Sequence, residues 1–144
     1  MNNPLLLLFL FTGIGIVIGM FAIAIAVIRT LKTSPDDTSA ILLPSVVYIA
    51  ALMSKPIYAF ILTVVAQTQT NLIGSPLLIA GALFGLVAIT QGCLGASFMR
   101  PTPSLSRTDA FSKLPLRLAV MGTIETIATM TMVFTIILTN TNAQ

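Results

Sequence analysis

The sequence contains no histidine, no tryptophan and a single cysteine, and only 8% of its 144 residues are charged. The lack of histidine excludes histidine-ligated metal sites and catalysis by a histidine base. The scarcity of charge argues against a soluble domain, in which about a quarter of the residues are charged. Glu125 is the only glutamate in the chain. Cys93 lies in an apolar segment, where a thiol is expected to be buried as a small hydrophobe.

What the chain has instead is hydrophobicity, with 56% apolar residues and a mean hydropathy of +1.03. A membrane-spanning helix needs about 20 predominantly apolar residues in succession. The sequence therefore predicts an all-α integral membrane protein whose four transmembrane helices form a single domain over residues 1–144, with little chain left for a soluble catalytic domain. The four stretches that qualify are Pro4–Ile28, Ala40–Ala66, Pro76–Met99 and Pro115–Leu138.

The basic residues are confined to two of the connections and their edges, apart from Lys55. The connection "QTQTNLIGS" and the tail "TNTNAQ" have none. The positive-inside rule predicts that both basic connections face the cytoplasm and that both termini lie on the other side. Anionic lipid or an acidic partner surface could also contact them, whereas nucleic acid is not expected because no aromatic residues are interleaved. These basic residues are Arg29 and Lys32 in the first group, and Arg100, Arg107, Lys113 and Arg117 in the second.

The two halves of the chain are similar when they are aligned without gaps. "NPLL" near the N-terminus then meets "SPLL", and Asp37 in the first basic connection meets Asp109 in the second. Matches in polar connections carry more weight, because the bilayer does not force their composition. The alignment predicts a duplicated helical hairpin, residues 1–70 and 73–144. Two spans return the chain to its starting side, so the copies are parallel repeats.

Small residues are concentrated in the first and third stretches. Because small residues let helix backbones approach closely in lipid, these two helices are predicted to pack tightly against each other. The run "GIGIVIG" has glycine spacing like that of a dinucleotide-binding loop, but no strand precedes it, so helix packing is the preferred interpretation. The glycines expected to serve this packing are Gly13, Gly15, Gly19, Gly85, Gly92 and Gly95.

Two ionisable residues, Glu125 and Lys55, lie inside the apolar stretches. Such residues are costly in a membrane and usually functional. At a helical rise of about 1.5 Å per residue, both lie roughly 15 to 17 Å from the cytoplasmic ends of their helices, and Gln91 lies about 12 Å from the end of its own. All three side chains are therefore predicted to meet near the bilayer centre.

The second stretch carries a polar stripe around Lys55. With i, i+3, i+4, i+7 spacing, one helix face carries Ala51, Ser54, Lys55 and Tyr58. Pro56 cannot donate a backbone hydrogen bond, so the carbonyl of Leu52 is predicted to need another partner at the same depth.

These oxygen-bearing groups predict reversible binding of a cation, either a proton or a small metal ion, at Glu125. The threonine and serine hydroxyls are weaker candidates, because in membrane helices they commonly bond to their own backbone. A structural ion pair between Glu125 and Lys55, held for helix packing, is the alternative. The candidate binding residues are Glu125, Gln91, Ser54, Tyr58, Lys55 and Thr126.

The order and spacing of several short motifs resemble a known family over essentially the whole chain. They are the small-residue first and third helices, "AITQGCLGAS" with Gln91, "IYAF" in the second stretch, and "IET" with Glu125 in the fourth. This set resembles the duplicated four-helix proteolipid, the K or c subunit, of V/A-type rotary ATPases and ATP synthases. The resemblance implies that Glu125 carries H+ or Na+, with no cofactor, while a ring of identical copies rotates and couples ion flow to ATP synthesis or hydrolysis.

The resemblance also implies roles for single residues and partners. By analogy with sodium-type members, Gln91 and Glu125 would hold the metal ion in this chain. Ser54 stands where those members have a threonine. Tyr58 stands where they have a tyrosine that hydrogen-bonds the glutamate. Lys55 departs from the family, because those members have a glutamine there, and its ammonium could occupy the cation position. Implied partners are neighbouring copies, a stator membrane subunit with an arginine, a central-stalk subunit at the cytoplasmic connections, and lipid.

Two other classes of protein remain as alternatives. One is a small four-helix proton-coupled exporter acting as a dimer, but such exporters carry their carboxylate in the first span and line a cavity with aromatic residues. This chain has no tryptophan and carries Glu125 in the fourth stretch, which favours the rotor subunit. The other is a scaffold that transports nothing, in which Glu125 and Lys55 only pair the helices.

Overall fold

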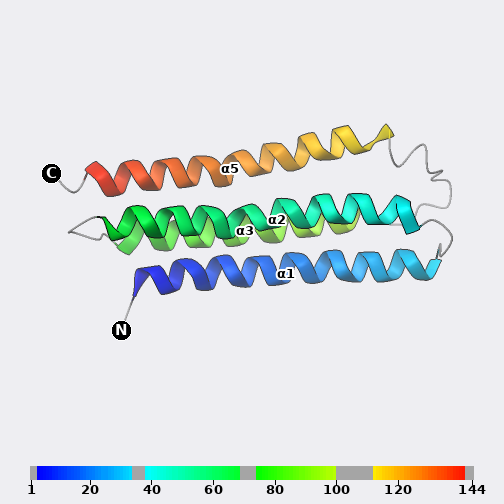
Figure 1. Cartoon of the computed structure of the whole chain (residues 1–144), viewed down its shortest axis with the longest axis horizontal. Helices are drawn as coiled ribbons and strands as arrows, with labels where there is room; N and C mark the ends of the chain where they lie inside the picture. Colours follow the sequence, from blue (N-terminus) through cyan, green and yellow to red (C-terminus); the bar gives the residue numbers. More distant parts are fainter. Residues whose placement is uncertain (1–2, 34–37, 69–73, 100–111, 142–144) are drawn as a thin grey trace.

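The computed structural model describes residues 3–33, 38–68, 74–99 and 112–141. Over these ranges it contains four long helices and no strand (Figure 1). Each helix is long and apolar enough to cross a membrane, so the prediction of an all-α protein with four transmembrane helices is confirmed. The helices are α1, Pro4–Thr33; α2, Thr38–Gln67; α3, Gly74–Phe98; and α5, Leu114–Thr141.

The helices mostly extend a few residues beyond the predicted apolar stretches. The largest difference is at α1, which continues to Thr33 through Arg29 and Lys32. Hydropathy marks only the part of a helix that is matched to the bilayer, whereas backbone hydrogen bonds continue into the polar region. α2 runs without a break through Pro44 and Pro56.

The four helix axes run side by side (Figure 1). α1 ends and α5 begins at the same end of the bundle, while α1 begins and α5 ends at the opposite end. The basic residues near the end of α1 and the start of α5 therefore gather at one end. Arg100 and Arg107, which were predicted to join them, lie outside the described residues.

Glycines bring α1 and α3 into direct backbone contact. A Cβ atom added to Gly15 would lie 2.3 Å from the backbone oxygen of Gly85, and one added to Gly92 would lie 2.2 Å from the Cα of Gly19. Backbone atoms, unlike the ends of side chains, cannot relieve such a close contact by changing rotamer. Gly81, another small residue of the third stretch, approaches the backbone of Leu8 in the same way.

Two of the expected packing glycines lie outside this contact. A Cβ added to Gly13 would meet nothing within 4 Å, so Gly13 is on an open face of α1. A Cβ added to Gly95 would lie 3.1 Å from the ring of Tyr48 in α2, so this glycine leaves room for that ring rather than for a backbone. Helical phase explains the difference, because only glycines on the face of α1 or α3 turned toward the other helix can shorten the distance between their axes.

Apolar side chains form two buried clusters inside the bundle. Leu52 of α2 and Met121 of α5 belong to one of them, and Ala59 and Ala128, two turns further along the same helices, belong to the other. The polar residues around Glu125 lie between the clusters. Many other large apolar side chains are exposed, as expected for faces that contact lipid or other chains. Cys93 is exposed on α3, so the expectation that it is buried was wrong.

A hydrogen bond from Thr30 links the end of α1 to the end of α3. Its buried hydroxyl lies 2.8 Å from the carbonyl oxygens of both Ala26 and Met99. Its single proton serves one acceptor at a time. The bond to Met99 satisfies a carbonyl that the last turn of α3 leaves without a helical partner.

Replacing Thr30 with valine is therefore expected to lower the free energy of unfolding by about 1 to 3 kcal/mol, because the buried Met99 carbonyl loses this donor. Denaturant unfolding in mixed micelles measures the change. Thr90→Val is the matched control, since the Thr90 hydroxyl is exposed and donates within its own helix, to the Leu86 carbonyl. Equal effects of the two substitutions would contradict the assigned role of Thr30.

Candidate ion-binding site

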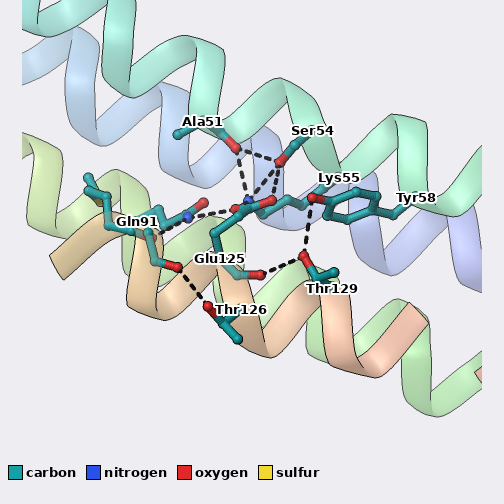
Figure 2. A network of polar contacts seen from close by, with 10 residues as sticks. Ala51, Ser54, Lys55, Tyr58, Gln91, Glu125, Thr126 and Thr129 are labelled. Carbon is teal, nitrogen blue, oxygen red and sulfur yellow. Dashed lines mark hydrogen bonds and ion pairs between the residues drawn. The ribbon is translucent and has the colours of Figure 1, made fainter. Parts of the chain in front are cut away.

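Glu125 projects from α5 toward α2 and α3 at the polar layer between the two apolar clusters (Figure 2). Its side chain is 24% exposed, whereas the Lys55 side chain beside it is completely buried. Gln91 of α3 is 1% exposed. The structure thus brings the intramembrane carboxylate, the lysine and the carboxamide together, each from a different helix.

Both oxygen atoms of the Glu125 carboxylate accept hydrogen bonds. Ser54 Oγ lies 2.7 Å from Oε1, and Gln91 Nε2 donates to Oε2 at 2.9 Å. Lys55 Nζ forms an ion pair with Oε2 (Figure 2). A charged carboxylate in a membrane needs such partners, because unpaired charge in an apolar medium is strongly unfavourable.

The Lys55 ammonium is fully satisfied within the site. It has three N–H donors and no acceptor. These donors face three oxygen atoms: the Ala51 carbonyl at 2.9 Å, Ser54 Oγ at 3.0 Å and Glu125 Oε2. The pair of Lys55 and Glu125 carries no net charge.

The backbone acceptor in this site differs from the one that the sequence indicated. Pro56 pointed to the carbonyl of Leu52, but the ammonium reaches the carbonyl of Ala51. Ala51 precedes Lys55 by one helical turn, so its carbonyl lies beneath the lysine side chain on the same face. The sequence had already placed Ala51 on the polar stripe of α2 by the same spacing, although without a role for its carbonyl.

Ser54 links the lysine to the carboxylate. Its hydroxyl oxygen accepts from Lys55, while its single proton serves either Glu125 Oε1 or the Ala51 carbonyl at 2.8 Å. When this proton goes to Glu125, Lys55 donates to Ser54 and Ser54 donates to Glu125, so each of these donors has an acceptor.

Tyr58 contacts α5 one turn beyond the carboxylate. Its hydroxyl lies 3.4 Å from Thr129 Oγ1, and Thr129 in turn donates to the backbone oxygen of Glu125 at 3.2 Å. The resemblance implied a hydrogen bond from Tyr58 to the glutamate side chain, but the hydroxyl instead reaches Thr129 (Figure 2). Thr129 shares a helix face with Glu125 because it follows by four residues.

Thr126 lies outside the site, although it directly follows Glu125 in the sequence. Its side chain is exposed, and its hydroxyl donates to the carbonyl of Gly122 at 3.0 Å. Adjacent residues on a helix project about 100° apart, so Thr126 turns away from the carboxylate. It is not a ligand in this arrangement.

Gln91 has one polar atom without a partner. Its Nε2 donates to Glu125 and, at 3.3 Å, to the carbonyl of Met121. Its Oε1 is buried and accepts no hydrogen bond from any described part of the chain. A buried acceptor of this kind costs free energy, and this one is carried by a side chain that contacts the carboxylate.

The described helices contain no group of three or more histidine, cysteine, aspartate or glutamate residues that could hold a metal ion. The oxygen atoms around Lys55 and Glu125 are instead of the kind that hard cations prefer. Comparisons of the chain with known protein families, with curated proteins and with solved structures found no match. Any assignment of function therefore depends on the residues and their geometry.

Proposed function

We propose that this protein is the ion-carrying rotor-ring subunit, or proteolipid, of a V/A-type rotary ATPase or ATP synthase. Glu125 binds a proton or a sodium ion reversibly, and passage of the ion couples to rotation of a ring of identical copies. The chain supplies one such carboxylate for its four helices. It performs no catalysis of its own, which belongs to the soluble part of the machine.

The single observation that carries the proposal is the Glu125 carboxylate in the middle of a membrane-spanning helix, hydrogen-bonded by Ser54 from α2 and by Gln91 from α3. A rotor has to carry its ion site past lipid, so the site must be uncharged overall while it does so. Donors from neighbouring helices around a partly buried carboxylate suit this requirement.

The tight pairing of α1 with α3 supports the same proposal. Gly15 and Gly92 bring α1 and α3 into direct backbone contact, and α2 and α5 lie beside this pair. A ring needs a narrow inner layer of helices and a wider outer one. We place α1 and α3 in the inner layer and Glu125 on the outer layer, where a stator arginine can reach it.

The expected surroundings follow from the charges. Both termini lie on the non-cytoplasmic side, and the basic connections lie in the cytoplasm beside a central-stalk subunit. Neighbouring copies cover part of the exposed apolar helix faces, and lipid covers the rest. No soluble cofactor or nucleic acid is needed.

The test uses the full chain, tagged and purified in mild detergent together with its partner subunits. Native mass spectrometry is expected to detect a closed ring of many copies. ATP-driven ion uptake by vesicles that contain the complex is expected to fall to background in Glu125→Gln, because the amide cannot take up and release a cation in this way. Thr123→Val should transport normally, since the Thr123 hydroxyl is exposed and donates within its own helix, to the Ala119 carbonyl.

A chain that is purified as a monomer or dimer would contradict the rotor assignment. So would a Glu125→Gln complex that transports at the normal rate. The Lys55–Glu125 ion pair favours a second candidate, a membrane scaffold that transports nothing. For a scaffold, Glu125→Gln would weaken assembly without changing any ion flux.

A further inference from the structure

We propose that Lys55 determines the ion selectivity of this site: its ammonium occupies the position of a bound cation and closes the site to metal ions. The inference rests on the proposed function, because it takes Glu125 as the ion-carrying group. It also makes a separate claim about the residues themselves. Beneath the ammonium lies a latent sodium site, and Lys55 is what keeps sodium out of it.

The first step is the identity of the atoms around the ammonium. Lys55 Nζ contacts a backbone carbonyl of Ala51, the hydroxyl of Ser54 and a carboxylate oxygen of Glu125. A carbonyl, a hydroxyl and a carboxylate are the oxygen types that hard metal cations bind in proteins. The ammonium uses every one of them, so none is left for a second cation.

The second step is charge. Lys55 is completely buried, and Glu125 is the only acidic residue among the described helices. One carboxylate balances one cation, so adding a metal ion beside the ammonium would leave a net positive charge inside the membrane. The other described basic residues lie near helix ends and are Arg29, Lys32, Lys113 and Arg117.

The third step is the unpartnered oxygen of Gln91. Its Oε1 is buried without a hydrogen bond, and its Nε2 points at Glu125 Oε2. Rotation of the carboxamide about its last bond exchanges the two atoms. The nitrogen suits a site whose cation is the ammonium, whereas the oxygen would add a further ligand if a metal ion took its place.

Removing the ammonium should therefore create a sodium site. Lys55→Gln supplies another carboxamide oxygen on the same face of α2, next to the oxygen atoms of Ala51, Ser54 and Glu125. Lys55→Met keeps an unbranched side chain but adds no oxygen, so it separates loss of the ammonium from gain of a ligand. For the natural chain, the same charge balance leaves one proton shared within the Lys55–Glu125 pair, rather than a metal ion, as the ion that the site can carry without net charge.

The experiment measures binding of radioactive sodium to purified full-length chains in detergent near neutral pH. We expect Lys55→Gln to bind about one sodium ion per chain, with an affinity about 100-fold or more above that of the natural chain. Lys55→Met is expected to bind more weakly than Lys55→Gln. Adding Glu125→Gln to Lys55→Gln should abolish the binding, and Thr123→Val should behave like the natural chain.

Saturable sodium binding to the natural chain that is lost in Glu125→Gln would overturn the inference, and this result needs no folded Lys55 variant. Failure of Lys55→Gln to bind sodium would also overturn it if circular dichroism shows normal helix content. Sodium should raise the melting temperature of Lys55→Gln alone, and an equal rise in the natural chain would be a further contradiction.

These results are separable from the proposed function. If the chain forms no ring but sodium binds only after Lys55 is replaced, the rotor assignment fails and the selectivity inference stands. If a ring transports ions and the natural chain binds sodium at Glu125, the selectivity inference fails and the rotor assignment stands.

Discussion

Replacing either member of the Lys55–Glu125 pair is expected to lower the free energy of unfolding by about 3 to 5 kcal/mol, because the remaining partner is left with its polar or charged group unpaired inside the bundle. Lys55→Met leaves the Glu125 carboxylate without its cation. Glu125→Gln leaves the ammonium, which is completely buried, facing a neutral amide. These are the largest effects of single polar substitutions that the structure suggests.

The double variant Lys55→Met with Glu125→Gln is expected to recover most of this loss. Neither charge remains, and exchanging a buried ion pair for uncharged groups of similar size is often close to neutral. The amide introduced by Glu125→Gln would also stay within reach of Ser54 and Gln91, whose bonds to the natural carboxylate are 2.7 and 2.9 Å.

Unfolding of the four chains in mixed micelles measures the coupling as a double-mutant cycle. We expect the loss in the double variant to be smaller than the sum of the single losses by at least about 2 kcal/mol. Thr123→Val controls for changes on the exposed face of α5. Additive losses would mean that the two side chains do not interact in the membrane.

Gly15→Ala is expected to destabilise the protein by about 3 kcal/mol or more, toward the upper end of the range for overpacked sites. The added methyl group would lie 2.3 Å from a backbone oxygen of Gly85, so α1 and α3 would have to separate. Separating α1 from α3 would also disturb the packing of α2 and α5, because both helices contact this pair.

Gly13→Ala is the matched control on the same helix. A Cβ at Gly13 would meet nothing within 4 Å, so we expect a change within about 0.5 kcal/mol. Unfolding in mixed micelles measures both variants. Comparable losses at Gly13 and Gly15 would contradict the assigned role of the contact between α1 and α3, since alanine is the better helix former and propensity alone would stabilise both variants.

Much of the site could be expected from the sequence, because depth in a membrane is a local property. The helical rise alone placed Glu125, Lys55 and Gln91 at similar depths, and the structure brings these three side chains into contact. The rotation of each helix about its axis could not be obtained in this way. It depends on how neighbouring side chains pack, which is why the Tyr58 hydroxyl reaches Thr129.

The sequence by itself determined the class of fold, since only helices satisfy the backbone of such apolar stretches inside a bilayer. It also limited the chemistry to one intramembrane carboxylate and a few oxygen-bearing neighbours. The tertiary structure alone decided which glycines join α1 to α3 and which atoms the Lys55 ammonium contacts. The three oxygen atoms around its ammonium come from two helices that are distant in the sequence, and only their packing brings them to one point.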